Sequence, residues 1–187
     1  METIRAFIAV DIGEEIRTAL GKVQRILQRA HADVKWVKPE NIHLTLAFLG
    51  NVSIDKIRPL ETALDLACQS QAPFSIHVAG TETFGKPRHP RIIWAGITES
   101  PALAELQQQT VEALHSVDIE FDARPFSPHL TLGRVKSPKH ITALLDALEP
   151  EKDSAFGSVE IAEALLIKSA LKPAGAKYTV LHRVALS

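Results

Sequence analysis

The chain has 187 residues, of which 45% are apolar and 23% are charged, and its formal net charge at pH 7 is −1. These values are typical of a globular protein and exclude a disordered or fibrous chain. The near-neutral charge also excludes the strongly basic surface that binds long nucleic acid nonspecifically, while a short or terminal nucleic-acid substrate stays open.

The first predicted elements are a strand and a helix. The segment "RAFIAVDI" (5–12) is rich in apolar and β-branched residues, which is typical of a buried strand. A helix is expected from Glu14 to Ala30, because apolar residues recur there at spacings of 4, 3 and 4, as on one face of an amphipathic helix. These residues are Ile16, Leu20, Val23 and Leu27.

An edge strand and a buried strand are predicted next. The segment "DVKWVKP" (33–39) alternates and stops at a proline, which is typical of an edge strand or a turn. It leads into the apolar run "HLTLAFLG" (43–50), which predicts a buried strand. We expect Gly50 and Asn51 to end this strand and Ser53 to cap a helix. The inner face of that helix carries Ile57, Leu60, Leu64 and Cys68.

The middle of the chain predicts two strands on either side of a basic loop. The segment "PFSIHVAGTETFG" (73–85) predicts one strand, "KPRHPR" (86–91) an exposed loop, and "RIIWAGI" (91–97) the other strand. A helix is expected from about Pro101, with Ser100 as its N-cap.

The rest of the chain predicts a second buried strand, a short helix and late strands. The segments are the strand "RPFSPHLTLGRV" (124–135), the helix "PKHITALLDALEP" (138–150), and the strands "SVEIAEALLIKSA" (158–170) and "KYTVLHRVALS" (177–187). This order of elements favours α/β or α+β layers, with helices packed outside sheets.

The tetrapeptide HLTL occurs twice, at 43–46 and 129–132, an offset of 129 − 43 = 86 residues. The same offset superposes 5–12 on 91–98, so each half runs strand, helix, proline and HLTL strand. No low-complexity linker separates the halves. We therefore expect residues 1–187 to form one domain of two intertwined lobes, related by an approximate two-fold axis.

Alternation along a strand places the histidine and threonine of each motif on one face. His43 and Thr45 project together, while Leu44 and Leu46 project to the other side, and the second motif repeats this arrangement. If the leucines enter the core, the polar pairs line a groove between the lobes. For a single copy a solvated sheet face is the alternative, but two matched copies favour a shared site.

Two imidazoles that converge on one groove suit acid–base catalysis, because the ordinary pKa of histidine is about 6.5. The reaction that matches best is in-line displacement at phosphorus, in which one imidazole takes a proton from water and the other protonates the leaving oxygen. The hydroxyls of Thr45 and Thr131 can hydrogen-bond the non-bridging oxygens. Arg134, three residues after Thr131, can add a fixed cation.

The paired motifs resemble the two signature motifs of the two-histidine (2H) phosphoesterases, in particular the RNA 2′,3′-cyclic phosphodiesterases once described as 2′-5′ RNA ligases. The likeness spans "RAFIAVDI", "WVKPENIHLTLAFLG" and "RPFSPHLTLGR", nearly the whole chain. It implies an α+β, bilobal fold of two pseudo-symmetric antiparallel sheets flanked by helices, with a central active-site groove. It also implies hydrolysis, without metal or cofactor, of RNA 2′,3′-cyclic phosphate ends to 2′-phosphomonoesters.

By position, the resemblance assigns catalysis to His43 and His129, and substrate or phosphate contacts to Thr45, Thr131 and Arg134. To leave a 2′-phosphate the 3′ oxygen must depart, so we assign His43 as the proton donor and His129 as the proton acceptor. Pseudo-symmetry leaves the exchange of these roles open. The first motif has Phe48 where the second has Arg134, so the site is expected to be asymmetric, with Phe48 in its wall or in the core.

The remaining histidines are dispersed and show no ligand spacing, so no metal site is predicted. Trp36 and Trp94 are candidates for base contact, since aromatic faces commonly bind unpaired RNA, and core packing is the alternative for both. The basic run at 86–91 either steers phosphates toward the groove or is a solvated loop.

Two other functions stay open on the residues alone. One is 2′-5′ RNA end joining, the reverse reaction, and the other is a noncatalytic RNA- or nucleotide-binding module. The expected partners are RNA with a 2′,3′-cyclic phosphate end or small cyclic nucleotides. No signal peptide, no apolar run of about 18 residues and a single cysteine predict a cytoplasmic protein without membrane contact, and we expect a monomer.

Overall fold

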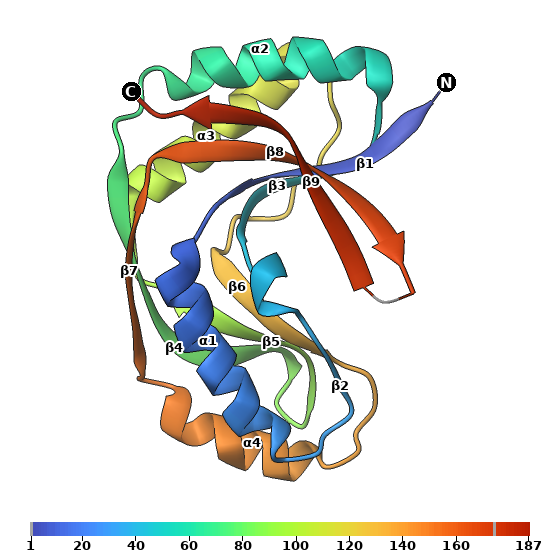
Figure 1. Cartoon of the computed structure of the whole chain (residues 1–187), viewed down its shortest axis with the longest axis vertical. Helices are drawn as coiled ribbons and strands as arrows, with labels where there is room; N and C mark the ends of the chain where they lie inside the picture. Colours follow the sequence, from blue (N-terminus) through green and yellow to red (C-terminus); the bar gives the residue numbers. More distant parts are fainter. Residues whose placement is uncertain (1, 174) are drawn as a thin grey trace.

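The computed structural model describes residues 2–173 and 175–187, which form two antiparallel sheets flanked by helices (Figure 1). The first sheet has the strand order β3-β1-β8-β9, and the second has the order β2-β6-β5-β4-β7. The predicted α+β class, with two antiparallel sheets, is confirmed. The strands of the first sheet are β1 (Thr3–Val10), β3 (Leu44–Ser53), β8 (Glu163–Lys172) and β9 (Gly175–Ala185). Those of the second are β2 (Val34–Trp36), β4 (Phe74–Lys86), β5 (His89–Ile97), β6 (His129–Val135) and β7 (Ala155–Ile161).

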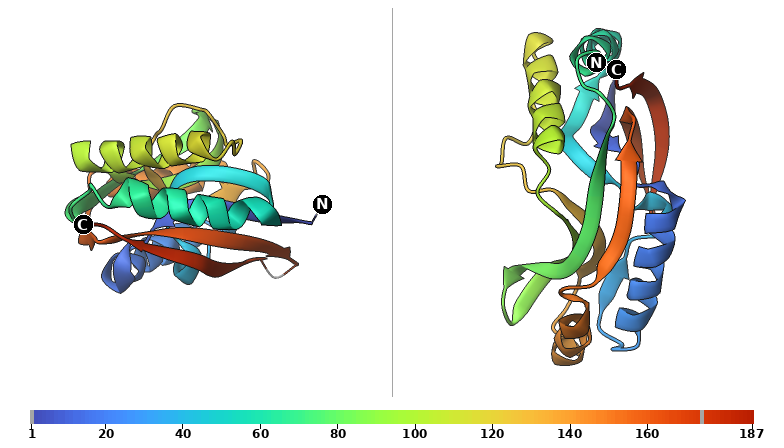
Figure 2. Two further views of the ribbon diagram at one scale, coloured as in Figure 1. Left: turned by 90° about the horizontal axis from the view of Figure 1, so that it is seen from above. Right: turned by 90° about the vertical axis from the view of Figure 1, so that its left-hand side faces the viewer.

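Helices cover one face of each sheet. α1 (Gly13–Gln28) packs on the second sheet, where the side-chain amide of Gln24 donates to the Leu132 carbonyl at 2.8 Å, and α4 (Ile141–Leu148) lies beside it. α2 (Ile57–Cys68) and α3 (Pro101–Ser116) lie side by side at the opposite end, against the first sheet, as Figure 2 shows. The described residues also include three short 3₁₀ helices: η1 (Pro39–Asn41), η2 (Ile54–Lys56) and η3 (Glu149–Glu151). None of the helices in 2–173 or 175–187 has the length and apolar character of a membrane span.

The two sheets exchange strands. β4 follows α2 of the first half but pairs with β5 in the second sheet, whereas β8 pairs with β1 in the first sheet. Both occupy interior positions, with a neighbour on each side. Because removing an interior strand exposes two unpaired rows of backbone groups, each half of the chain needs the other to complete its sheet.

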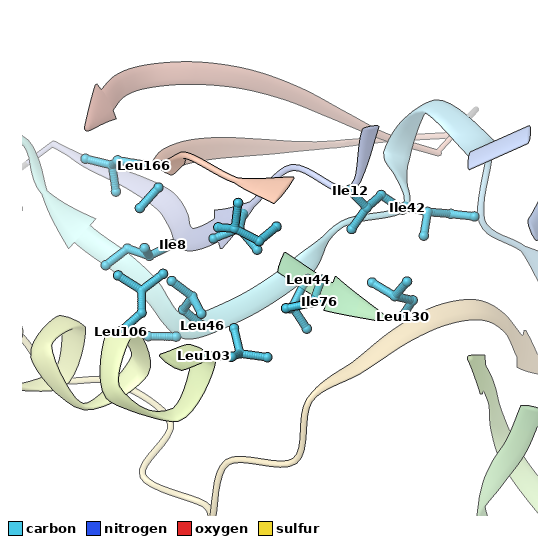
Figure 3. Packing of buried hydrophobic residues seen from close by; sticks show 14 of the residues in the cluster. Ile8, Ile12, Ile42, Leu44, Leu46, Ile76, Leu103, Leu106, Leu130 and Leu166 are labelled. Carbon is cyan, nitrogen blue, oxygen red and sulfur yellow. The ribbon is translucent and has the colours of Figure 1, made fainter. Parts of the chain in front are cut away.

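The leucines of both HLTL motifs enter the core, as predicted. Leu44 and Leu46 of β3 and Leu130 and Leu132 of β6 are all buried in one apolar cluster. Figure 3 shows Leu44, Leu46 and Leu130 among the side chains packed between sheets and helices. The opposite face of each motif strand is therefore the one that carries histidine and threonine.

Several local signals are confirmed. The Ser100 hydroxyl caps α3 by accepting from the Leu103 N–H at 3.3 Å. Cys68 is buried at the end of α2, and burial raises the pKa of its thiol to about 11. This cysteine is an inert core residue, because the thiol form is favoured at neutral pH.

Two predicted boundaries in the first half are wrong. Gly50 and Asn51 do not end the first motif strand, since β3 continues to Ser53. Gly50 instead has a φ of +64° beside a register shift in the β1–β3 pairing, and a glycine with positive φ suits a bulge as well as a turn. Ser53 does not cap the next helix, because its hydroxyl donates to the carboxylate of Asp55.

The segment 86–91 is a hairpin rather than a loop. β4 runs to Lys86 and β5 begins at His89, so only two residues form the turn. Pro90 lies in β5 at a register shift, a position where a strand tolerates proline.

The segment 158–170 is two strands rather than one. β7 ends at Ile161 in the second sheet and β8 begins at Glu163 in the first. The residue between them is Ala162, which is neither glycine nor proline, so the sequence marks no break.

The buried leucines of the motifs should contribute more to the free energy of unfolding than exposed leucines do. We expect Leu44→Ala to lower the free energy of unfolding by about 2–5 kcal/mol, because it leaves a cavity in the core. The matched control is Leu66→Ala on α2, whose side chain is 65% exposed and whose loss should cost less than about 0.5 kcal/mol. Urea unfolding of both variants measures the difference, and equal losses would contradict the assigned core.

Candidate functional site

The two motif histidines are anchored in the same way. The His43 Nδ1 lies 2.8 Å from the Asn41 carbonyl oxygen, and the His129 Nδ1 lies 2.7 Å from the Ser127 carbonyl oxygen. A carbonyl only accepts, so each Nδ1 carries a hydrogen and donates it to the residue two positions earlier. Each Nε2 is therefore the ring nitrogen that can exchange protons with a bound substrate or water.

The imidazoles belong to different sheets, and the charge of His129 reaches His43. Burial is the main cause that lowers the pKa of His43, while its hydrogen bond to the Asn41 carbonyl opposes this effect. The charges of Arg17 and His129 lower the pKa of His43 further. Strands β3 and β6 contact each other, which brings the two motifs together. The expected convergence of His43 and His129 is thus supported both by strand contact and by electrostatics.

Each histidine ring is held between two aromatic rings of its own sheet. Phe7 of β1 stacks on His43 with ring centroids 4.6 Å apart, and Tyr178 of β9 meets His43 edge-on at 5.3 Å. On the other side, His129 meets Phe84 at 4.9 Å and Trp94 at 6.1 Å. These contacts restrict the orientation of both imidazoles and account for the burial of His43.

Of these four aromatic residues, the sequence suggested only Trp94, as a candidate for base contact rather than as support for a histidine. Phe7 and Trp94 sit within predicted strands, and alternation places them opposite the core residues Ile8 and Ile93. Phe84 and Tyr178 reach the site through the strand exchange, which no local pattern reveals.

A bulge in β6 brings Arg134 to the face of Thr131. Simple alternation puts residues 131 and 134 on opposite faces. In the pairing with β5, however, Thr131 lies opposite Trp94 and Arg134 opposite Ile92, so one extra residue is accommodated between them. Trp94 and Ile92 share a face of β5, and Arg134 therefore shares the face of Thr131.

The first motif has a matching bulge. Thr45 pairs with Ala9 and Phe48 pairs with Phe7, which share a face of β1. Phe48 thus occupies the position equivalent to Arg134 and is 46% exposed, so of the two predicted places it lies in the wall and not in the core. We call the surface formed by His43, Thr45, Phe48, His129, Thr131 and Arg134, with their aromatic neighbours, the two-histidine face.

Arg134 acts across the two sheets. Burial raises the pKa of Tyr178 in the first sheet, and the charges of Arg134 and Arg5 lower it. A side chain of β6 therefore lies within electrostatic reach of the phenol that contacts His43. A phosphate at this place would meet a guanidinium from one sheet and an imidazole from each.

Trp36 has a different position. It pairs with Gly133 of β6, and its ring lies only 3.0 Å from where a Cβ of that glycine would be. Gly133 pairs with the fully buried Ile93, so Trp36 packs on the core side of the second sheet. This placement favours core packing, the alternative to base contact.

Two of the other histidines have partners of their own. His77 contacts the Ser158 hydroxyl at 2.6 Å, and His182 contacts the Asp65 carboxylate at 2.8 Å. Within 2–173 and 175–187, no group of three or more histidine, cysteine, aspartate or glutamate residues could hold a metal ion.

Comparison with known proteins agrees with this geometry. The family model "LigT like Phosphoesterase" matches the chain twice, over residues 10–94 and 96–178. The chain is 36% identical over 182 residues to a protein of Methanothermobacter thermautotrophicus named RNA 2′,3′-cyclic phosphodiesterase, covering 94% of this chain and 95% of that one. It is 35% identical to the protein of that name from Archaeoglobus fulgidus, with 94% and 96% covered.

Solved structures show the same fold. The crystal structure of TT0787 of Thermus thermophilus has a TM-score of 0.80 and 32% identity, with 97% of each chain covered. That of Escherichia coli LigT complexed with 3′-AMP has a TM-score of 0.78 and 26% identity, with 100% of this chain and 99% of that chain covered. The resemblance noted from the motifs is confirmed, and the chain belongs to the LigT-like phosphoesterase family.

Proposed function

We propose that this chain hydrolyses RNA ends bearing a 2′,3′-cyclic phosphate to 2′-phosphomonoesters, with His43 and His129 as the acid and the base. The observation that carries the proposal is the matched pair of imidazoles from two sheets, each with its Nδ1 bonded to a carbonyl and its Nε2 without a hydrogen-bond partner among the described residues. The curated relatives named RNA 2′,3′-cyclic phosphodiesterase support this substrate. A solved relative in complex with 3′-AMP supports a site for a nucleoside monophosphate.

The proposed reaction is a single in-line displacement. The Nε2 of His129 takes a proton from water as the water oxygen bonds to phosphorus. The bond from phosphorus to the 3′ oxygen breaks, and the Nε2 of His43 gives its proton to that oxygen. The product keeps the phosphate on the 2′ oxygen, and proton exchange with solvent restores both histidines.

Charge on the reacting phosphate is balanced by the two-histidine face. Thr45 and Thr131 share the faces of their histidines, so their hydroxyls can donate to the non-bridging oxygens. Arg134 adds a permanent positive charge that the other motif lacks. These groups supply the proton transfers and the charge stabilisation, so the proposed mechanism uses no metal.

The lowered pKa of His43 fits the role of proton donor once the phosphate is bound. An imidazolium with a lowered pKa is a stronger acid and gives up its proton more readily. Without a bound anion, His43 is mainly neutral at pH 7, because burial opposes its charge. The anionic phosphate raises the population of the protonated form where the reaction needs it.

Removing either histidine should abolish turnover. We expect His43→Ala and His129→Ala each to lower kcat/KM for adenosine 2′,3′-cyclic phosphate by about 10²–10⁴-fold, the usual contribution of one acid–base group. The assay contains a chelator and identifies the product as the 2′-phosphate. The control is His115→Ala, an exposed histidine of α3. Full activity in either motif variant, with folding intact, would exclude the mechanism.

The roles of the two histidines can be separated by the leaving group. A phosphodiester with a 4-nitrophenolate leaving group departs without a proton, so His43→Ala should lose at least about tenfold less activity on it than on the cyclic phosphate. His129→Ala should lose similar activity on both. The opposite pattern would assign the acid to His129 and the base to His43.

The pKa of His43 should be visible by NMR titration. We expect its ring proton to titrate below the ordinary value of 6.5 in the free protein and at higher pH with a 2′-phosphate bound. Because the folded-state pKa is lowered, the neutral ring stabilises the fold above the unfolded value, and this stability is lost as pH falls through the folded-state pKa. A free-protein midpoint above 6.5 would contradict the burial of the ring.

A further inference from the structure

Two side chains next to the reacting groups have no part in the proposed chemistry. Phe48 projects from β3 on the two-histidine face and is 46% exposed, unusual for so large an apolar side chain. Arg5 lies two residues before Phe7 on β1 and shares its face. Phe7 connects both to the site, since it stacks on His43 and lies beside Phe48 with ring centroids 6.2 Å apart.

Arg5 is an available cation close to the reaction. It is exposed and, among the described residues, forms no ion pair or side-chain hydrogen bond. Its charge lowers the pKa of Tyr178, the same phenol that senses Arg134. The two arginines therefore reach a common region from different sheets. Arg134 shares the face of Thr131 on β6. Arg5 lies two residues from Phe7 on β1, which corresponds to about 7 Å along the strand.

The second sheet offers no equivalent position. Phe84 and Trp94 stack on one another at 4.9 Å with an interplanar angle of 26°, so each covers a face of the other. The place that Phe48 occupies in the first motif is taken by Arg134 in the second. On the first-sheet side, by contrast, the Phe48 ring is exposed, and Arg5 forms no ion pair among the described residues.

We propose that Arg5 and Phe48 form a binding position for the penultimate nucleotide of an RNA end. This inference rests on the proposed function. Arg5 binds the phosphodiester that joins the terminal nucleotide to the rest of the RNA. Phe48 stacks the base of the preceding nucleotide without regard to its identity, because every base has a π face. The preferred substrate is then an oligonucleotide end rather than a free cyclic mononucleotide.

The test compares a dinucleotide ending in a 2′,3′-cyclic phosphate with the corresponding cyclic mononucleoside phosphate. The wild-type protein should show a kcat/KM at least about tenfold higher on the dinucleotide. In Arg5→Gln and Phe48→Ala this ratio should fall to within about twofold of unity. Arg5→Lys and Phe48→Tyr, which keep the charge and the ring, should retain part of it. The effect of Arg5 should also shrink as salt rises.

Matched controls lie on α2, away from both sheets' motif strands. Arg58→Gln removes an exposed arginine that also forms no ion pair among the described residues, and Leu66→Ala removes an exposed apolar side chain. Both should keep the wild-type ratio. A wild-type ratio near unity, or a ratio unchanged in Arg5→Gln and Phe48→Ala, would overturn the proposed position.

Failure of this inference differs from failure of the proposed function. If the wild-type protein hydrolyses neither substrate, the proposed function fails. The position is then tested by binding, with a dinucleotide and a mononucleoside that each end in a 2′-phosphate. A dinucleotide preference that Arg5→Gln and Phe48→Ala remove would support the position, and equal affinities in the wild-type protein would overturn it.

Discussion

Burial of the motif leucines orients everything else in the site. Leu44 and Leu46 in β3, and Leu130 and Leu132 in β6, pack into the main core, so the histidine and threonine that alternate with them must face away from it. Turning either strand over would bury an imidazole and a hydroxyl and expose two leucines. The hydrophobic core therefore sets the direction in which both imidazoles point, and the carbonyls of Asn41 and Ser127 then fix which ring nitrogen is free.

A bulge after each threonine adds the asymmetry. One extra residue in each motif strand restores the following side chain to the two-histidine face, where continuous alternation would have directed it elsewhere. The bulge in β6 places the guanidinium of Arg134 on this face, and the bulge in β3 places the phenyl ring of Phe48 on it. Two nearly equivalent strands thereby become chemically different, with Arg134 suited to a phosphate and Phe48 to an apolar or aromatic partner.

The exchange of β4 and β8 joins the halves in a way that also serves the site. The interior strands of each sheet come from both halves of the chain, and one aromatic ring beside each histidine, Tyr178 at His43 and Phe84 at His129, depends on this exchange. The family model matches the chain in two segments that begin 96 − 10 = 86 residues apart, the same offset as the two motifs. This supports the proposal that residues 1–187 are one domain of two related, intertwined lobes.

The sequence alone determined the strand and helix order as far as residue 150, the burial of the leucines and the pairing of two His-x-Thr motifs, because these depend on local periodicity and on an internal repeat. It also marked Ser100 as a cap and Cys68 as a core residue. Only the tertiary structure decided the exchange of strands, the break at Ala162, the core-side placement of Trp36, and the bulges that place Arg134 and Phe48. Strand partners and register come from contacts between distant segments, so a one-residue change in pairing reverses a side chain's direction without leaving any local sign.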